Sequence, residues 1–334
     1  MDLSLTGEQN ELLSWADTVL PVEFALDRFN GIEGALQETA LDKLAELGWY
    51  GMAVPERAGG SGMSVLEEML LMKEAGKYLA SPSLLATVVA VHDAVGNGDN
   101  ALAQELMACS KRASLAIASD KALLALDADE ADLLVAFGLN AVTLQSTDGL
   151  ARLGGAGTPL DDSLSLMRYG IDPENARAHA ADTRLWMRAH ILLAASQVGL
   201  GEAATDMAVE YAKIREQFGS PIGAFQAIKH KCADMALHLT AARSQLMYAA
   251  AAFNERLPEA EYRTLCAGAL AETASMRAAF DNVQVHGGIG FTSECHAQRF
   301  VKRATVLQAA GNVNKRYREQ LLAGAPEPNL SSAA

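Results

Sequence analysis

Two segments in the last third of the chain carry side chains that could hold a phosphate-containing ligand. In the first, YAKIREQFGSPIGAFQ, Arg215 offers a planar fork of N–H donors that suits a pyrophosphate. Two amides and two aromatic rings follow, which offer hydrogen-bonding groups and flat apolar surfaces for rings: Gln217, Phe218, Phe225 and Gln226. This combination of side chains suits a nucleotide.

In the second segment, QVHGGIGFTSECHAQRFVKRA, a glutamine precedes a pair of glycines. Gln284 could bond an adenosine group, and Gly287 and Gly288 leave room for the backbone to approach a cofactor closely, as only glycine can. Each feature alone has a simpler explanation, because an Arg on a helix is usually solvated or paired and two glycines usually make a turn. The joint pattern favours the cofactor role.

Other polar side chains in this region have simpler explanations. His286 and His296 have no partner ligands at zinc spacing, so local hydrogen bonding is the simpler interpretation. The 4 cysteines lie far apart without a CxxC pair, which disfavours a disulfide or a zinc site. A basic cluster is most simply a solvated or interface face, although it could steer phosphates: Lys302, Arg303, Lys315, Arg316 and Arg318.

The overall composition excludes several classes of function. The 334 residues include 27 Lys and Arg against 41 Asp and Glu, a formal charge of 27 − 41 = −14. Nucleic-acid binding is not expected, because affinity for the phosphate backbone needs clustered Lys and Arg. The N-terminus lacks the basic and then apolar run of a signal peptide, and the apolar stretches are shorter than a membrane span. We therefore expect a cytoplasmic protein with no membrane partner.

The elements that must position these residues fall into three parts. Thr6 is an N-cap candidate for the first helix, and Gln9 completes a capping-box pattern. The short runs RASLAIAS, DLLVAFG and VTLQST predict a few β-strands, and the Ala-rich runs after them predict long antiparallel helices. The expected bounds are 1–108 for an N-terminal helical domain, 109–181 for a middle β-domain, 182–325 for a C-terminal four-helix bundle and 326–334 for a disordered tail.

The two C-terminal segments, in this order, resemble the acyl-CoA dehydrogenase family, whose bundle carries R-x-Q-F-G followed by F-Q and later Q-x-x-G-G-x-G-[FY]. The N-terminal LAELGWYGMAVPERAGGSGMS is similar to that family's Gly-Trp, Pro-Glu and Gly-Gly-x-Gly loop. The resemblance covers residues 1–108 and 182–320 and is poor between them. It implies a mainly α fold with an N-terminal helical domain, a reduced middle β-domain and a C-terminal antiparallel four-helix bundle.

The resemblance also implies a cofactor. In the family, the matching positions serve the ADP half of an FAD that is bound mainly by the neighbouring subunit. We refer to these eight residues as the half-site: Arg215, Gln217, Phe218, Phe225, Gln226, Gln284, Gly287 and Gly288.

The catalytic base of the family has no counterpart in this sequence. Acyl-CoA dehydrogenases remove the α-proton of a thioester with a positioned carboxylate while the β-hydrogen leaves as hydride to the flavin. The family places that carboxylate at one of two positions, which match Gly311 and Ala189 here, and neither stretch contains an acid. The middle segment also lacks the Thr-Glu-Pro and Gly-Ser-Asp stretches that hold the isoalloxazine. No catalytic residue is therefore expected in this chain.

Some bacterial acyl-CoA dehydrogenases that act on steroid side-chain thioesters are α2β2 heterotetramers in which one subunit type lacks the catalytic Glu. This sequence looks like that subunit, which implies an FAD shared with a catalytic partner and an acyl-CoA substrate. Two alternatives stay open. One is a self-sufficient enzyme with a displaced base, such as Glu294 or Glu202, and the other is a flavin-free scaffold or CoA-binding protein.

Overall fold

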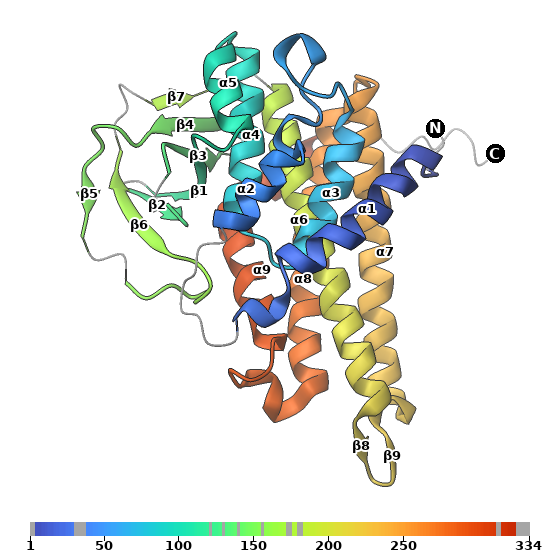
Figure 1. Cartoon of the computed structure of the whole chain (residues 1–334). Coiled ribbons are helices and arrows are strands. Elements are labelled where there is room, and N and C mark those ends of the chain that lie inside the picture. The colour runs from blue at the N-terminus through green and yellow to red at the C-terminus, as the bar shows by residue number, and fades with distance from the viewer. Residues whose placement is uncertain are drawn as a thin grey trace, which may run out of the picture.

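The structure is a computed structural model in which helices from both ends of the sequence pack together beside a β-sheet (Figure 1). The tail expected to be disordered, 326–334, lies outside the described residues. Those residues are 4–29, 38–119, 122–128, 131–138, 141–154, 157–171, 176–178, 183–311 and 315–324.

The first helix begins where the sequence predicts. The hydroxyl of Thr6 accepts from the Gln9 N–H at 3.2 Å, and the Gln9 side chain accepts from the Thr6 N–H at 3.1 Å. The predicted capping box is therefore confirmed. The N-terminal helices are α1 (Gly7–Glu23), α2 (Glu38–Glu46), α3 (Val65–Lys77), α4 (Pro82–Gly96) and α5 (Asn100–Met107).

The middle segment forms one sheet with the strand order β5-β6-β2-β1-β3-β4-β7. β1 and β3 run parallel, and the other neighbouring strands run antiparallel. The three predicted runs are β1, β3 and β4, whereas β5 and β7 are too short for an alternating pattern to reveal them. The bounds are β1 (Ala113–Ala118), β2 (Ala122–Leu126), β3 (Leu133–Phe137), β4 (Val142–Ser146), β5 (Arg152–Leu153), β6 (Leu166–Gly170) and β7 (Ala176–Ala178).

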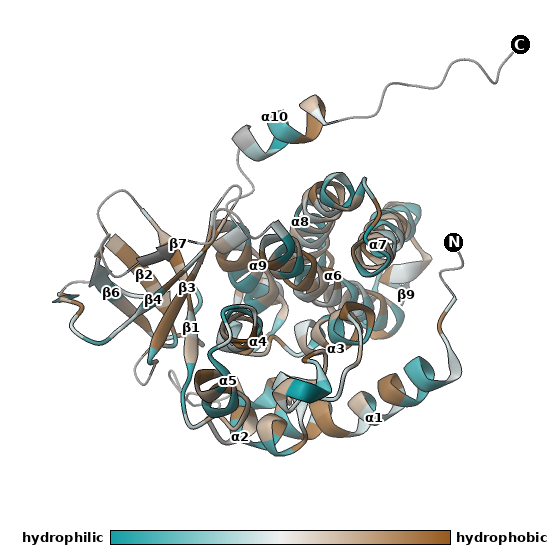
Figure 2. Ribbon diagram, turned by 90° about the horizontal axis from the view of Figure 1, so that it is seen from above, coloured by the Kyte–Doolittle hydropathy of each residue, from teal (hydrophilic) through white to brown (hydrophobic). Residues whose placement is uncertain are grey.

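The C-terminal helices form the predicted antiparallel bundle, in which α8 packs against α6, α7 and α9. Figure 2 views the helices from above, with the sheet to one side of them. The predicted fold class, mainly α with a small middle sheet, is confirmed. The bounds are α6 (Thr183–Ile214), α7 (Gln226–Asn254), α8 (Ala260–His286), α9 (Ala297–Gly311) and α10 (Lys315–Ala323).

Glycines bring the N-terminal helices into backbone contact with the bundle. A Cβ on Gly76 of α3 would lie 2.2 Å from the Ser196 carbonyl oxygen, and one on Gly199 of α6 would lie 1.8 Å from the Lys73 carbonyl oxygen. Only glycine permits such an approach, so α3 is fixed directly against α6. Within the described ranges, no helix has the length and hydropathy needed to cross a membrane.

A buried arginine joins all three parts of the chain. Arg303 of α9 donates from Nε to Asp161 of the middle segment at 2.6 Å, and from Nη1 to the carbonyl oxygens of Leu79 and Ala80 at 2.7 and 2.6 Å. Arg303 and Asp161 are each 2% exposed. Burial alone would raise the pKa of the Asp161 carboxyl, but the Arg303 guanidinium holds it below its ordinary value.

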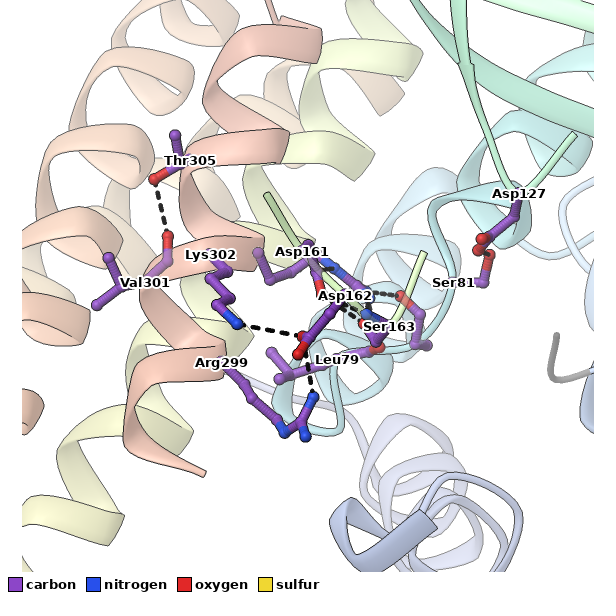
Figure 3. A network of polar contacts seen from close by, with 12 residues as sticks. Leu79, Ser81, Asp127, Asp161, Asp162, Ser163, Arg299, Val301, Lys302 and Thr305 are labelled. Carbon is purple, nitrogen blue, oxygen red and sulfur yellow. Dashed lines mark hydrogen bonds and ion pairs between the residues drawn. The ribbon is translucent and has the colours of Figure 1, made fainter. Parts of the chain in front are cut away.

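The interpretation of the basic cluster as a solvated face was therefore wrong for Arg303. Its neighbour Lys302 is partly exposed and pairs with Asp162 at 3.3 Å, and Arg299 reaches the same carboxylate at 3.2 Å (Figure 3). Arg318 is mostly exposed, and the side chains of Lys315 and Arg316 lie outside the described residues.

Candidate functional site

The two predicted nucleotide segments meet at the lower end of the bundle in Figure 1. The Tyr211 ring of α6 stacks on the His286 ring of α8, with centroids 4.1 Å apart and planes 22° apart. One turn earlier on both helices, the Asn282 amide lies 3.4 Å from the Met207 sulfur. The two helices therefore run in the same direction, and their C-terminal ends are held side by side.

A hairpin continues from α6 and carries three of the eight predicted residues, Arg215, Gln217 and Phe218. Arg215 follows the last residue of α6 and is exposed, and its carbonyl accepts from the Ile222 N–H at 2.7 Å. The strands β8 (Glu216–Gln217) and β9 (Ser220–Pro221) pair across Phe218 and Gly219, which have φ of +53° and +77°. Positive φ values at both central residues define a type I′ turn, whose twist matches that of the two flanking strands.

The aromatic and amide groups of this hairpin and of the start of α7 are open to solvent. Phe218 is 93% exposed, and its ring meets that of Phe225 edge to face with centroids 6.1 Å apart. Gln217 and Gln226 are exposed too, and the Gln217 amide donates to the Glu216 carbonyl at 2.8 Å. Apolar rings at such exposure mark a surface that another molecule can cover.

The N-terminus of α7 adds positive potential to this end. The residue before it, Phe225, provides no side-chain cap, and a helix N-terminus attracts anions through its N–H groups and dipole. Residues 211–231 carry four Lys or Arg and one Glu, a net 4 − 1 = +3 within a chain of −14. The sequence predicts a helix from Ala227, close to the observed start at Gln226, but a role for that helix start and for Lys229 in anion binding was not inferred. The local reversal of charge could have revealed it.

The end of α8 presents the remaining half-site residues. Gln284 and Gly288 are exposed, and Gly287 is half-buried. Gly287 has φ +66° and ψ −142°, a conformation that essentially only glycine adopts. A Cβ on either glycine would meet nothing within 4 Å, so the surface above them is open. The structure thus places the eight residues on neighbouring elements at one end, and none of them is fully buried.

The two positions at which the sequence analysis expected a base and found none are closed by packing. Ala189 is fully buried in α6, and Gly311 is buried at the end of α9. Beside Ala189, the His190 ring lies 4.6 Å from Trp186, 5.7 Å from Phe137 and 5.8 Å from Tyr317, measured between centroids. These rings fill the space between the sheet and the bundle.

The buried imidazole of His190 makes folding sensitive to acid. Burial lowers the pKa of His190 from 6.5 to about 4, so the unfolded chain takes up this proton more readily than the folded one. Stability is therefore expected to fall as pH drops from about 6.5 to about 4, by about 3 kcal/mol in total. Urea unfolding at several pH values should show that His190→Phe loses this part of the acid sensitivity. An unchanged slope would contradict the assignment.

The two candidate displaced bases occupy unsuitable surroundings. Glu202 lies in an ion-pair network with Lys73 at 3.1 Å, Lys77 at 3.9 Å and Arg243 at 3.4 Å. Glu294 is exposed, and a hydrogen bond from Thr292 lowers the pKa of its carboxyl. A base for a weak carbon acid needs a dry pocket that is open to the substrate. Glu202 is held by three cations and Glu294 lies in solvent, so neither residue occupies such a pocket.

The cavities beside the sheet differ in size and polarity. One of about 180 Å³ lies between the sheet and α9 and has an apolar lining that includes Leu124, Leu166 and Val306. Another of about 820 Å³ is lined by residues of α5, β3 and β4 and carries five carboxylates, which would repel an anionic nucleotide. Neither cavity contains a half-site residue.

Two domains of one protein family match the chain. The acyl-CoA dehydrogenase N-terminal domain matches residues 11–106, and the acyl-CoA dehydrogenase C-terminal domain matches residues 180–323. Among curated proteins, acyl-CoA dehydrogenase IpdE2 of Mycobacterium tuberculosis is 31% identical over 261 residues, which cover 78% of this chain and 77% of the relative.

Solved structures share the fold over nearly the whole chain. A chain of the ChsE4-ChsE5 complex from Mycobacterium tuberculosis superposes with a TM-score of 0.78 at 22% identity, covering 98% of this chain and 100% of that one. A variant of the Tcur3481-Tcur3483 steroid ACAD gives 0.78 at 23% identity, covering 95% and 97%. At these identities the likeness establishes the fold alone.

Proposed function

This chain belongs to the acyl-CoA dehydrogenase family, and from that premise we propose that it is a non-catalytic subunit that completes the FAD site of a catalytic partner. One observation carries the proposal: Arg215, Gln284 and Gly288 are exposed to solvent at one end of the bundle. An open set of nucleotide-binding groups needs a second surface, and we assign that surface to the partner.

The residues present fit the ADP half of FAD. Arg215 offers paired donors to a pyrophosphate, the start of α7 adds a positive helix end, and Gln284 offers an amide to the adenosine. FAD, when bound, accepts the hydride in an α,β-dehydrogenation. This chain would bind and orient the cofactor from the ADP side only. Of the two cavities beside its sheet, the apolar one of about 180 Å³ is below the roughly 300–1,000 Å³ of small-molecule sites, and the one of about 820 Å³ carries five carboxylates that would repel the cofactor's phosphates.

Removal of the α-proton of the thioester is assigned to the partner. Ala189 and Gly311 offer no proton acceptor, and the rings around His190 leave no open site beside Ala189. In this arrangement the partner supplies the base and the isoalloxazine pocket, and the present chain excludes water from the ADP side of the cofactor.

The partner is proposed to be a catalytic acyl-CoA dehydrogenase subunit in an α2β2 complex. Support comes from the ChsE4-ChsE5 complex and the Tcur3481-Tcur3483 steroid ACAD, which share the fold and whose names each join two proteins. The substrate class that follows is an acyl-CoA thioester, with a steroid side chain as the specific candidate. We propose a cytoplasmic location for the complex.

The half-site is tested by Arg215→Ala in the co-expressed complex. A charge-assisted contact to a pyrophosphate contributes roughly 1.5–3 kcal/mol, so FAD should bind about 10- to 150-fold more weakly. FAD release can be followed by flavin fluorescence. Arg57→Ala, which removes an exposed arginine from the N-terminal part, is the matched control and should leave retention unchanged. Equal retention in both variants would refute the assignment of Arg215.

The displaced-base alternative is tested by Glu202→Gln and Glu294→Gln in the same complex. Both variants should keep nearly full turnover per bound FAD, because Glu202 is ion-paired and Glu294 is exposed. Loss of a general base reduces turnover by about 10²–10⁴-fold, which steady-state assays resolve easily. If either change abolishes turnover while FAD stays bound, the chain is catalytic. A complex that binds no FAD at all would favour the scaffold alternative.

A further inference from the structure

We propose that Tyr211 and His286 are positioning residues that set the spacing between the pyrophosphate contact and the adenosine contact. The inference rests on the proposed half-site. Its basis is the ring stack between the ends of α6 and α8, with centroids 4.1 Å apart. Both rings are half-buried, and each lies within one helical turn of a half-site residue.

The orientation of His286 is fixed from its own helix. Its Nδ1 lies 2.9 Å from the Asn282 carbonyl oxygen, and because a carbonyl can only accept, Nδ1 carries the proton. The turn after α8 folds back onto the same side chain. A Cβ on Gly290 would lie 2.8 Å from the Val283 carbonyl oxygen and 3.0 Å from the His286 Cβ, so glycine is required there. The turn that contains Gly287 and Gly288 therefore packs against the base of the His286 side chain, while the imidazole stacks on Tyr211.

Tyr211 connects this arrangement to Arg215. The Arg215 N–H donates to the Tyr211 carbonyl at 2.9 Å, in the last turn of α6. On the other helix, Gln284 precedes His286 by two residues. A shift of one ring against the other would change the distance between the Arg215 and Gln284 backbones. The stack thus fixes the distance between Arg215, which follows α6, and Gln284 of α8. A fixed distance lets both residues contact one dinucleotide at the same time.

The test compares His286→Ala, Tyr211→Ala and the double variant in the co-expressed complex, with FAD as the probe. Ring stacking contributes modestly, so each single change should weaken FAD retention about 2- to 12-fold. The double variant should be no weaker than the worse single variant, because both changes remove the same contact. His286→Phe keeps a ring and should recover most of the retention. His238→Ala, which removes a half-buried histidine further along α7 and outside the 211–231 segment, is the control.

Thermal unfolding of each variant separates positioning from stability. We expect FAD retention to fall with little change in Tm, and His286→Phe to restore it. Retention that follows Tm across all variants, additive losses in the double variant, or unchanged retention would each overturn the positioning role. Arg215→Ala in the same assay keeps the two proposals distinct: if it weakens FAD while His286→Ala does not, the half-site stands and this inference fails.

Discussion

Arg303→Met is expected to destabilise the protein by about 3–5 kcal/mol, because it leaves the Asp161 carboxylate buried without its counter-charge. The arginine and the acid are each 2% exposed, and the same guanidinium also satisfies the carbonyls of Leu79 and Ala80. Urea unfolding of the purified chain measures the change directly. All three parts of the chain meet at the Arg303 guanidinium, so the sheet and the helices should both lose stability.

A neighbouring lysine provides the control for this prediction. Lys302→Met removes a partly exposed cation whose partner Asp162 is half-exposed, and such pairs contribute about 0–1 kcal/mol. The double variant Arg303→Met with Asp161→Leu removes both charges and should be more stable than Arg303→Met alone. If Arg303→Met costs no more than Lys302→Met, the buried ion pair does not hold the three parts together.

The second large effect concerns the chain without a partner. Purified alone, it should be colourless or weakly flavinated, with turnover on acyl-CoA thioesters at least about 10²–10⁴-fold below that of the complex. The physical reason under the proposed function is that Gly311 and Ala189 offer no proton acceptor at the two proposed base positions and that the half-site is exposed. Flavin absorbance and a dye-coupled assay give both readouts. A yellow, active protein with one FAD per chain would instead support the displaced-base enzyme.

The helices could be predicted because their signals are local. The Thr6 and Gln9 capping box and the Ala-rich periodic runs depend on neighbours a few residues apart, and the structure confirms both. The short strands β5 and β7 could not be predicted, because their pairing with β6 and β4 decides their conformation rather than their two or three residues.

The sequence could predict which residues form the candidate site, but not how the fold brings them together. The sequence identified Arg215 and Gln284, but the stack that brings α6 and α8 together joins residues that are far apart along the chain. Arg303 was misassigned for a related reason, since its partners Asp161 and Leu79 come from two other parts of the chain. A basic residue in a basic cluster gives no sign of burial until the tertiary partners are known.

The FAD content of the complex tests the central claim most directly. The chain is co-expressed with a full-length catalytic homologue, the complex is purified, and FAD released by denaturation is counted against both polypeptides. The open half-site without a base predicts one FAD for each pair of unlike chains. One FAD on every chain, or a partner that holds its full FAD content without this chain, would contradict the account.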